Sequence, residues 1–117
     1  MNIEDYRSYC ISKPGVTEEF PFDYETLVFK VMGKIFALTS VETFISVNLK
    51  CDPELAIELR ESYHSIQPGY HMNKKHWNTI ETDGDVPDGK LRELIDISYN
   101  LVVKGLTKKL KQELNSL

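Results

Sequence analysis

Apolar residues recur along this chain with two periods, one helical and one extended, and these periods predict its elements. The first helical stretch spans residues 3–12, where Ile3, Tyr6 and Cys10 follow the i, i+3, i+7 spacing of one buried face. The helix is expected to end ahead of Pro14, because the residue before a proline is pushed out of the helical region.

Two further helices are predicted in the second half of the chain. One begins at Asp52-Pro53, since aspartate is a favoured N-cap and proline a favoured first residue, and it ends before Pro68. Apolar residues at helical spacing predict the longest helix over residues 88–110, with late lysines that complement the helix dipole. Gly105 interrupts this helix and indicates a kink or a close packing point.

Extended segments rich in β-branched and aromatic residues predict four strands, and Gly33 supplies the turn of a hairpin between the first two. The strands are expected at residues 26–31, 35–39, 44–49 and 77–82, with a loop at residues 16–24. The order α-β-β-β-α-β-α indicates an α+β fold with an antiparallel sheet and helices on one face. A chain of 117 residues suffices for one core, so we expect a single domain over residues 1–117.

Charge and composition narrow the classes of function. The formal net charge of −4 argues mildly against general affinity for nucleic acids, which usually requires a basic surface. No apolar run approaches the roughly 20 residues that span a bilayer, and no secretory signal is visible. We therefore expect a cytoplasmic protein without a membrane partner, in which Cys10 and Cys51 are reduced and structural.

The densest group of chemically active side chains lies at residues 69–79. It contains Tyr70, His71, Asn73, Lys74, Lys75, His76, Trp77 and Asn78. The lysines and histidines suit contacts with phosphates, and the aromatic rings suit stacking on bases. In the alternative interpretation, Trp77 anchors the core at the start of a strand and the lysines beside it are only solvated. We also expect the amide of Asn73 or Asn48 to be satisfied by backbone groups.

Metal binding and catalysis find less support in the sequence. His64, His71 and His76 lack the cysteine pair or nearby glutamate that would complete a zinc site. No nucleophile-elbow, zinc-protease, P-loop or dinucleotide motif is present. The remaining option for catalysis is a histidine that acts as a general base and is oriented by Asp83 or Asp85. We expect no cofactor, no bound metal and no enzymatic activity.

Nearly the whole chain resembles the MmcQ/YjbR family of small bacterial proteins. The segments that carry the resemblance are Lys13-Pro14-Gly15, Phe29-Lys30-Val31, Gly33-Lys34-Ile35-Phe36-Ala37, Val47-Asn48-Leu49-Lys50-Cys51 with Pro53-Glu54, Gly69 to Trp77, and Asp96 to Val102. The His-x-Asn-Lys-x-His-Trp block, His71 to Trp77, is the most specific of them.

The resemblance implies a CyaY-like two-layer sandwich, in which helices back a curved antiparallel sheet. It also implies DNA binding through a "double wing" arrangement. Because the family is similar to frataxins in architecture, iron binding is a further implication, but the first helix lacks the dense acidic ridge that such binding would use.

Together these observations predict a non-enzymatic, monomeric protein that binds DNA through a basic face formed by the sheet and its loops. The candidate contact residues are Lys30, Lys34, Lys50, Tyr70, His71, Asn73, Lys74, Lys75 and His76. The alternative is a module that binds another protein or a small anion, and a third hypothesis is a frataxin-like metal carrier.

Overall fold

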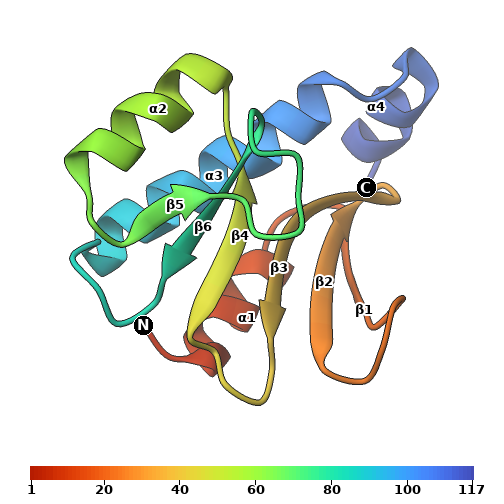
Figure 1. The fold of residues 1–117 in the computed structure, drawn as a ribbon. Coiled ribbons are helices and arrows are strands. Elements are labelled where there is room, and N and C mark those ends of the chain that lie inside the picture. The colour runs from red at the N-terminus through yellow and green to blue at the C-terminus, as the bar shows by residue number, and fades with distance from the viewer.

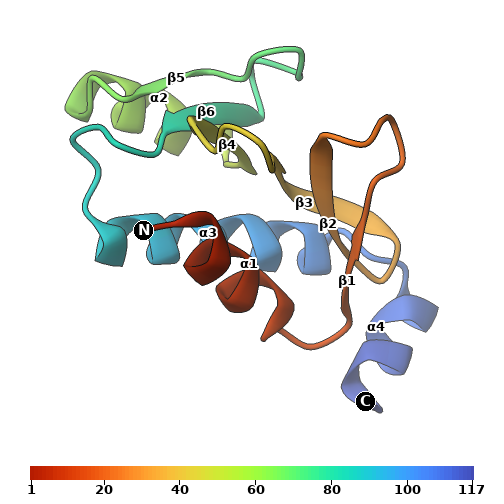
Figure 2. The ribbon, with the colours of Figure 1, turned by 90° about the horizontal axis from the view of Figure 1, so that it is seen from below.

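The computed structural model describes residues 1–117, and in it a curved, six-stranded antiparallel sheet packs helices against one of its faces (Figures 1 and 2). In chain order the elements are α1 (Ile3–Ile11), β1 (Val16–Glu19), β2 (Thr26–Val31), β3 (Lys34–Ser40), β4 (Ser46–Lys50), α2 (Pro53–Ser62), β5 (Ile66–Pro68), β6 (Trp77–Glu81), α3 (Asp88–Lys104) and α4 (Lys108–Asn115). The strands lie in the order β1-β2-β3-β4-β6-β5. This arrangement confirms the predicted α+β sandwich.

The two edges of the sheet are formed by short strands that the sequence pattern did not predict. The expectation of a loop over residues 16–24 is wrong for its first four residues, which pair with β2 as strand β1. The two glutamates of β1 form ion pairs with Arg7 and Lys30, so an acidic segment is tolerated in the sheet. Strand β5 ends in Pro68, whose missing N–H is tolerated at a sheet edge.

The predicted helix over residues 88–110 is divided into two helices at Gly105. Helix α3 ends at Lys104, and the hydroxyl of Thr107 then caps α4 by accepting a hydrogen bond from the backbone N–H of Leu110 at 3.2 Å. A threonine two residues after a glycine supplies a new N-cap, which favours a second helix start at this point. None of the helices has the length and apolar character that a membrane span requires.

The core fills the space between the sheet and the helices. Tyr6 of α1 meets Phe29 of β2 edge to face, with ring centroids 5.7 Å apart, and Cys10 is fully buried as the helical spacing predicts. Burial raises the pKa of the Cys10 thiol to about 12, so this side chain acts as a small apolar group. The remaining core side chains come from strands β2 to β6, from helices α2, α3 and α4, and from Cys51 and Leu106.

One hydroxyl group fastens the longest helix to the centre of the sheet. Ser98 of α3 is completely buried, and its Oγ donates a hydrogen bond to the carbonyl of Phe36 in β3. The same oxygen accepts a hydrogen bond from the backbone N–H of Lys50 in β4 at 2.8 Å. The pairing of β2 with β3 is irregular near Phe36, and here the serine bridges two strands where no β3–β4 register pair is formed.

Replacing this serine should weaken the whole fold. Ser98→Ala leaves a buried carbonyl and a backbone N–H without partners, which costs roughly 2–3 kcal/mol of unfolding free energy. Urea denaturation measures this loss. Asn100→Ala, on the exposed side of the same helix, is the matched control and should change stability by less than about 0.5 kcal/mol. Equal stability of the two variants would show that the bridge contributes nothing.

Candidate functional site

The face of the sheet that points away from α1 and α3 is the candidate binding surface, here named the open face (Figure 2). The strand register decides which side chains occupy it, because successive residues of a strand alternate between faces. In β4 and β6, Asn48 is opposite Thr79, and Lys50 is opposite Trp77. The open face comprises Thr26, Val28, Lys30, Ile35, Leu38, Ser40, Ser46, Asn48, Lys50, Gln67, Trp77, Thr79 and Glu81.

Two of the predicted lysines, Lys30 and Lys50, lie on this face toward one end, here named the basic end. Lys34 is exposed at the same end of the sheet, but its strand partner is the inward-facing Val31, so it lies at the border with α3. Lys50 is the direct cross-strand neighbour of Trp77, and Lys34 and Lys50 line one cleft of about 250 Å³ beside the C-terminus of α3. Lys30 lies on the open face, but its ammonium group is 3.0 Å from the carboxylate of Glu19. The structure therefore brings Lys34 and Lys50 together and leaves Lys30 partly neutralised.

The loop between β5 and β6, residues 69–76, rises beside the open face and contains the other candidates. Lys74 donates to the carbonyl of Gly69 at 2.9 Å, so its charge is directed into its own loop. Lys75 is exposed and has no ion-pair partner within its loop. Tyr70 and His71 are both exposed, and their rings lie 4.0 Å apart between centroids.

Two asparagines organise the polar cluster, as predicted for one of them. The side-chain oxygen of Asn73 accepts hydrogen bonds from the backbone N–H groups of Lys75 and His76, which confirms its role as a turn-forming residue. Asn48 is satisfied differently, because its side-chain oxygen accepts from the hydroxyl of Thr79. That hydroxyl also accepts from the backbone N–H of Tyr70 at 2.8 Å, which fixes the start of the loop over the sheet.

Trp77 begins strand β6 and buries most of its surface, as predicted, but it does so outside the core cluster. The residue faces the open side of the sheet, is partly buried, and is absent from the side chains that pack around the core. The strand register explains this position, because Asn78 and Ile80 take the inward positions of β6. A tryptophan at this position has an accessible ring surface beside Lys50.

Arg60 of α2 holds the loop in place, and sequence reasoning missed it. Its guanidinium donates to the side-chain oxygen of the buried Asn78 at 2.7 Å and to the carbonyls of Lys74 and Trp77. Asn78 also donates to the carbonyl of Ala56 at 3.4 Å. A polar residue at an inward strand position was the available signal, since a buried amide requires a partner.

Four of the exposed large apolar side chains lie on segments that adjoin strands of the open face. Phe22 and Tyr24 belong to the β1–β2 loop, Ile45 precedes β4, and Tyr70 belongs to the β5–β6 loop; these side chains are 67%, 99%, 67% and 69% exposed. Exposed apolar groups that border a polar surface are typical of binding sites.

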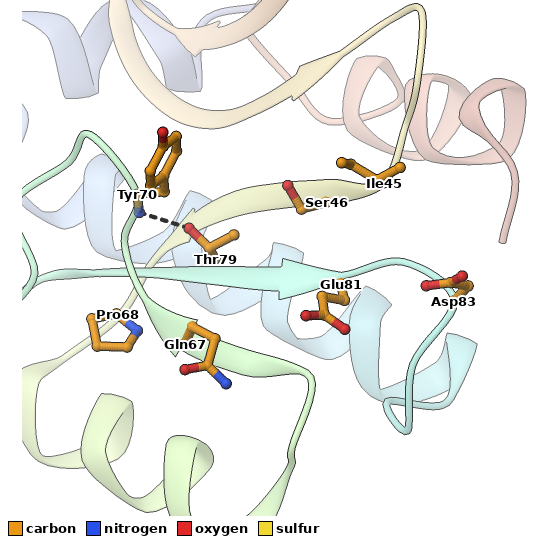
Figure 3. A pocket seen from close by; sticks show the side chains of 8 residues that line it. All are labelled: Ile45, Ser46, Gln67, Pro68, Tyr70, Thr79, Glu81 and Asp83. Carbon is orange, nitrogen blue, oxygen red and sulfur yellow. Dashed lines mark hydrogen bonds between the residues drawn. The ribbon is translucent and has the colours of Figure 1, made fainter.

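At the end of the open face opposite the basic end, a cleft of about 390 Å³ opens over β4, β5 and β6 (Figure 3). Its lining residues are Ile45, Ser46, Gln67, Pro68, Tyr70, Thr79, Glu81 and Asp83. Figure 3 shows Thr79 at the middle of the cleft, with the hydrogen bond from the Tyr70 backbone drawn as a dashed line.

The residues that the sequence offered for metal binding and acid–base chemistry lie apart or have other partners, as the candidate metal ligands and Asp85 show. No three histidine, cysteine or acidic side chains converge in a way that could hold a metal ion. The carboxylate of Asp85 accepts hydrogen bonds from the backbone N–H groups of His64 and Ser65 at 2.9 and 3.0 Å, so it caps the chain there. The Ser65 side chain, followed by these backbone N–H groups, lowers the pKa of Asp85 to about 2.

Removal of Arg60 should loosen the loop before it unfolds the protein. Arg60→Met leaves the side-chain oxygen of Asn78 and the carbonyl of Lys74 without this donor, and we expect a loss of roughly 2–3 kcal/mol of unfolding free energy. Amide hydrogen exchange over residues 69–77 should accelerate more than exchange in β2 and β3. Arg92→Met on the exposed side of α3 is the control. Unchanged exchange in the loop would rule out the anchoring role.

Asp85 should make stability depend on pH in acid. Its pKa in the folded state is lowered to about 2, so its stabilising contribution is complete above the pKa of the unfolded chain, about 3.9. The contribution is lost as the pH falls from about 5 toward 2. The difference in urea midpoint between the wild type and Asp85→Asn should therefore be constant above about pH 5 and shrink below it. A difference that does not vary with pH would contradict this assignment.

Comparison with known proteins places this architecture among uncharacterised relatives. The chain is 37% identical to the uncharacterised protein YjbR of Escherichia coli K12 over 107 residues, which covers 91% of each chain. It is 42% identical to the uncharacterised protein YbdF of Escherichia coli O157:H7 over 107 residues, covering 91% of this chain and 88% of YbdF.

Solved structures share the fold. The crystal structure of Deinococcus radiodurans protein DR2400, described as a DUF419 domain, aligns with a TM-score of 0.90 and 48% identity over 97% of this chain and 88% of that one. A crystal structure of a Pseudomonas syringae protein aligns with a TM-score of 0.74 and 28% identity, covering 86% of this chain and 98% of the other. The YjbR family model matches residues 11–101, and the chain therefore belongs to the YjbR family.

Proposed function

We propose that this protein is a non-enzymatic DNA-binding module that takes a single strand across the open face. The observation that carries the proposal is the cross-strand pair of Lys50 and Trp77, which sets an ammonium group beside a partly exposed aromatic residue on the sheet face that points away from α1 and α3. Proteins that bind single strands combine a cationic track for phosphates with aromatic rings on which bases stack.

Further aromatic rings support the same function. Tyr70 is exposed on the β5–β6 loop, and Phe22 and Tyr24 are exposed on the β1–β2 loop. Stacking on such rings requires unpaired bases, which a duplex does not present, so the proposed ligand is single-stranded.

The free positive charges limit the strength of this binding. Lys30 is paired with Glu19 and Lys74 with its own loop, so phosphate contacts fall to Lys34, Lys50 and Lys75. Three phosphate contacts on a single strand correspond to a slope of log K against log salt of about −2. Binding is therefore expected to be weak and strongly salt-dependent, in keeping with a net charge of −4.

A module for binding another protein is the second candidate function. The specific observation in its favour is the exposed side chain of Ile45, which has neither an aromatic ring for base stacking nor a polar group for nucleic-acid contacts. If the protein binds another protein, the lysines of the basic end lie at the rim of that interface. Addition of oligonucleotides then causes no change at the residues of the open face.

The single tryptophan provides a direct test of DNA binding. Titration with an oligothymidylate strand at about 20 mM salt should quench Trp77 fluorescence, because a base stacks on the ring, and the quench should weaken with the salt slope given above. Lys50→Gln should weaken binding several-fold, whereas Lys109→Gln on exposed α4 removes the same charge as a control and should have little effect. If the wild-type fluorescence does not respond to the strand at low salt, the DNA function is excluded.

A further inference from the structure

The two ends of the open face differ in charge, and only the basic end enters the proposal above. The cleft over β4, β5 and β6 has no lysine or arginine in its lining and contains two carboxylates, those of Glu81 and Asp83. Neither carboxylate belongs to an ion pair of the structure. Its volume of about 390 Å³ is in the range that holds a nucleoside-sized molecule.

The hydrogen-bonding groups in the cleft are mainly acceptors. Thr79 has no donor left for a ligand, since its hydroxyl donates to Asn48 and also accepts from the Tyr70 backbone. The side-chain N–H of Gln67 donates to the carbonyl of His64 at 2.9 Å, which leaves its oxygen available. A ligand that fits this cleft must therefore bring donors for Gln67 and the two carboxylates, because ionised carboxylates can only accept.

The strand register adds one donor at a defined place beside these acceptors. Ser46 is directly opposite Glu81 in the β4–β6 pair, which puts their Cβ atoms about 5 Å apart on the same face. The Ser46 hydroxyl has no partner in the structure and is free to donate. From Ser46 on β4 across to Glu81 on β6, the protein therefore presents one hydrogen-bond donor and then a carboxylate with two acceptor oxygens.

Among the four bases, guanine matches this order of groups. Its Watson–Crick edge presents the acceptor O6 followed by the donors N1–H and N2–H₂, which suit Ser46 and then Glu81. Adenine and cytosine place a ring-nitrogen acceptor, and thymine a second carbonyl, where the carboxylate requires a donor. The apolar surfaces of Tyr70 and Pro68 at the cleft wall suit the flat faces of a base.

The carboxylates are compatible with a nucleic acid only if the phosphates stay away from them. From Trp77 to Glu81 the open face extends four residues along β6, or about 13 Å, which is enough to separate a base in the cleft from phosphates at the basic end. A strand whose phosphates lie beside Lys50 and whose uncharged base edge lies beside Glu81 therefore avoids repulsion between phosphates and carboxylates.

We propose that the cleft formed by Ser46, Gln67, Tyr70, Thr79, Glu81 and Asp83 is a binding site for an unstacked guanine base. This inference rests on the proposed DNA function, because it assigns a base preference to the strand that crosses the open face.

The test compares labelled nine-nucleotide thymidylate strands that carry guanine, adenine, cytosine or thymine at the central position. Fluorescence anisotropy should show about tenfold tighter binding of the guanine strand, the discrimination expected of a two-bond contact to one base. Glu81→Gln and Ser46→Ala should each reduce this preference to about twofold or less while the plain thymidylate strand still binds. Glu58→Gln, an exposed acid on α2 outside the cleft, removes the same charge and should retain the full preference.

A second measurement separates this inference from the function on which it rests. Guanosine, which has no phosphate, should shift the amide resonances of Ser46, Thr79 and Glu81 in the wild type, and adenosine should not. Strands that bind equally well whatever their central base would overturn the guanine site and leave the DNA function standing. Guanosine binding in the cleft without binding of any strand would support the guanine site and overturn the DNA function. If neither guanosine nor any strand binds, both proposals fail.

Discussion

Helices cover one face of the sheet, and this one-sided burial determines the other features of the molecule. Each central strand must present apolar residues to α1, α2 and α3, so its alternate residues face away from the core. Ser98 sets the distance between α3 and the strands by bridging β3 and β4. The uncovered positions are thereby free for polar and charged side chains, which is why the candidate site lies on this face.

The position of the loop at residues 69–76 also follows from the burial of one face of the sheet. Asn78 takes an inward position in β6, where its buried amide requires partners, and Arg60 supplies one while also holding the carbonyls of Lys74 and Trp77. The loop is thus anchored from the core side of the sheet by α2. Hydrogen bonds within the loop, at Asn73 and Lys74, add to this anchor and hold its residues beside the open face.

Sequence patterns predicted the long elements well because their apolar periods are complete. They failed at β1 and β5, which have too few residues to show alternation, and at Gly105, after which Thr107 caps a second helix. At the site, the turn role of Asn73 followed from its residue type, because its bonds are local. The positions of Trp77, Lys30 and Lys74 did not, since each depends on a register or a long-range partner that no local pattern encodes.

The account assigns one face of the sheet to ligand binding and divides it into a basic end and an acceptor-rich cleft. The most direct measurement is a map of backbone amide shifts during titration with a guanine-containing single strand at low salt. The account predicts changes in β4 and β6, centred on Lys50 and Trp77 and reaching Glu81, with α1 and the exposed side of α3 unaffected. Shift changes confined to the helices, or none at all, would contradict it.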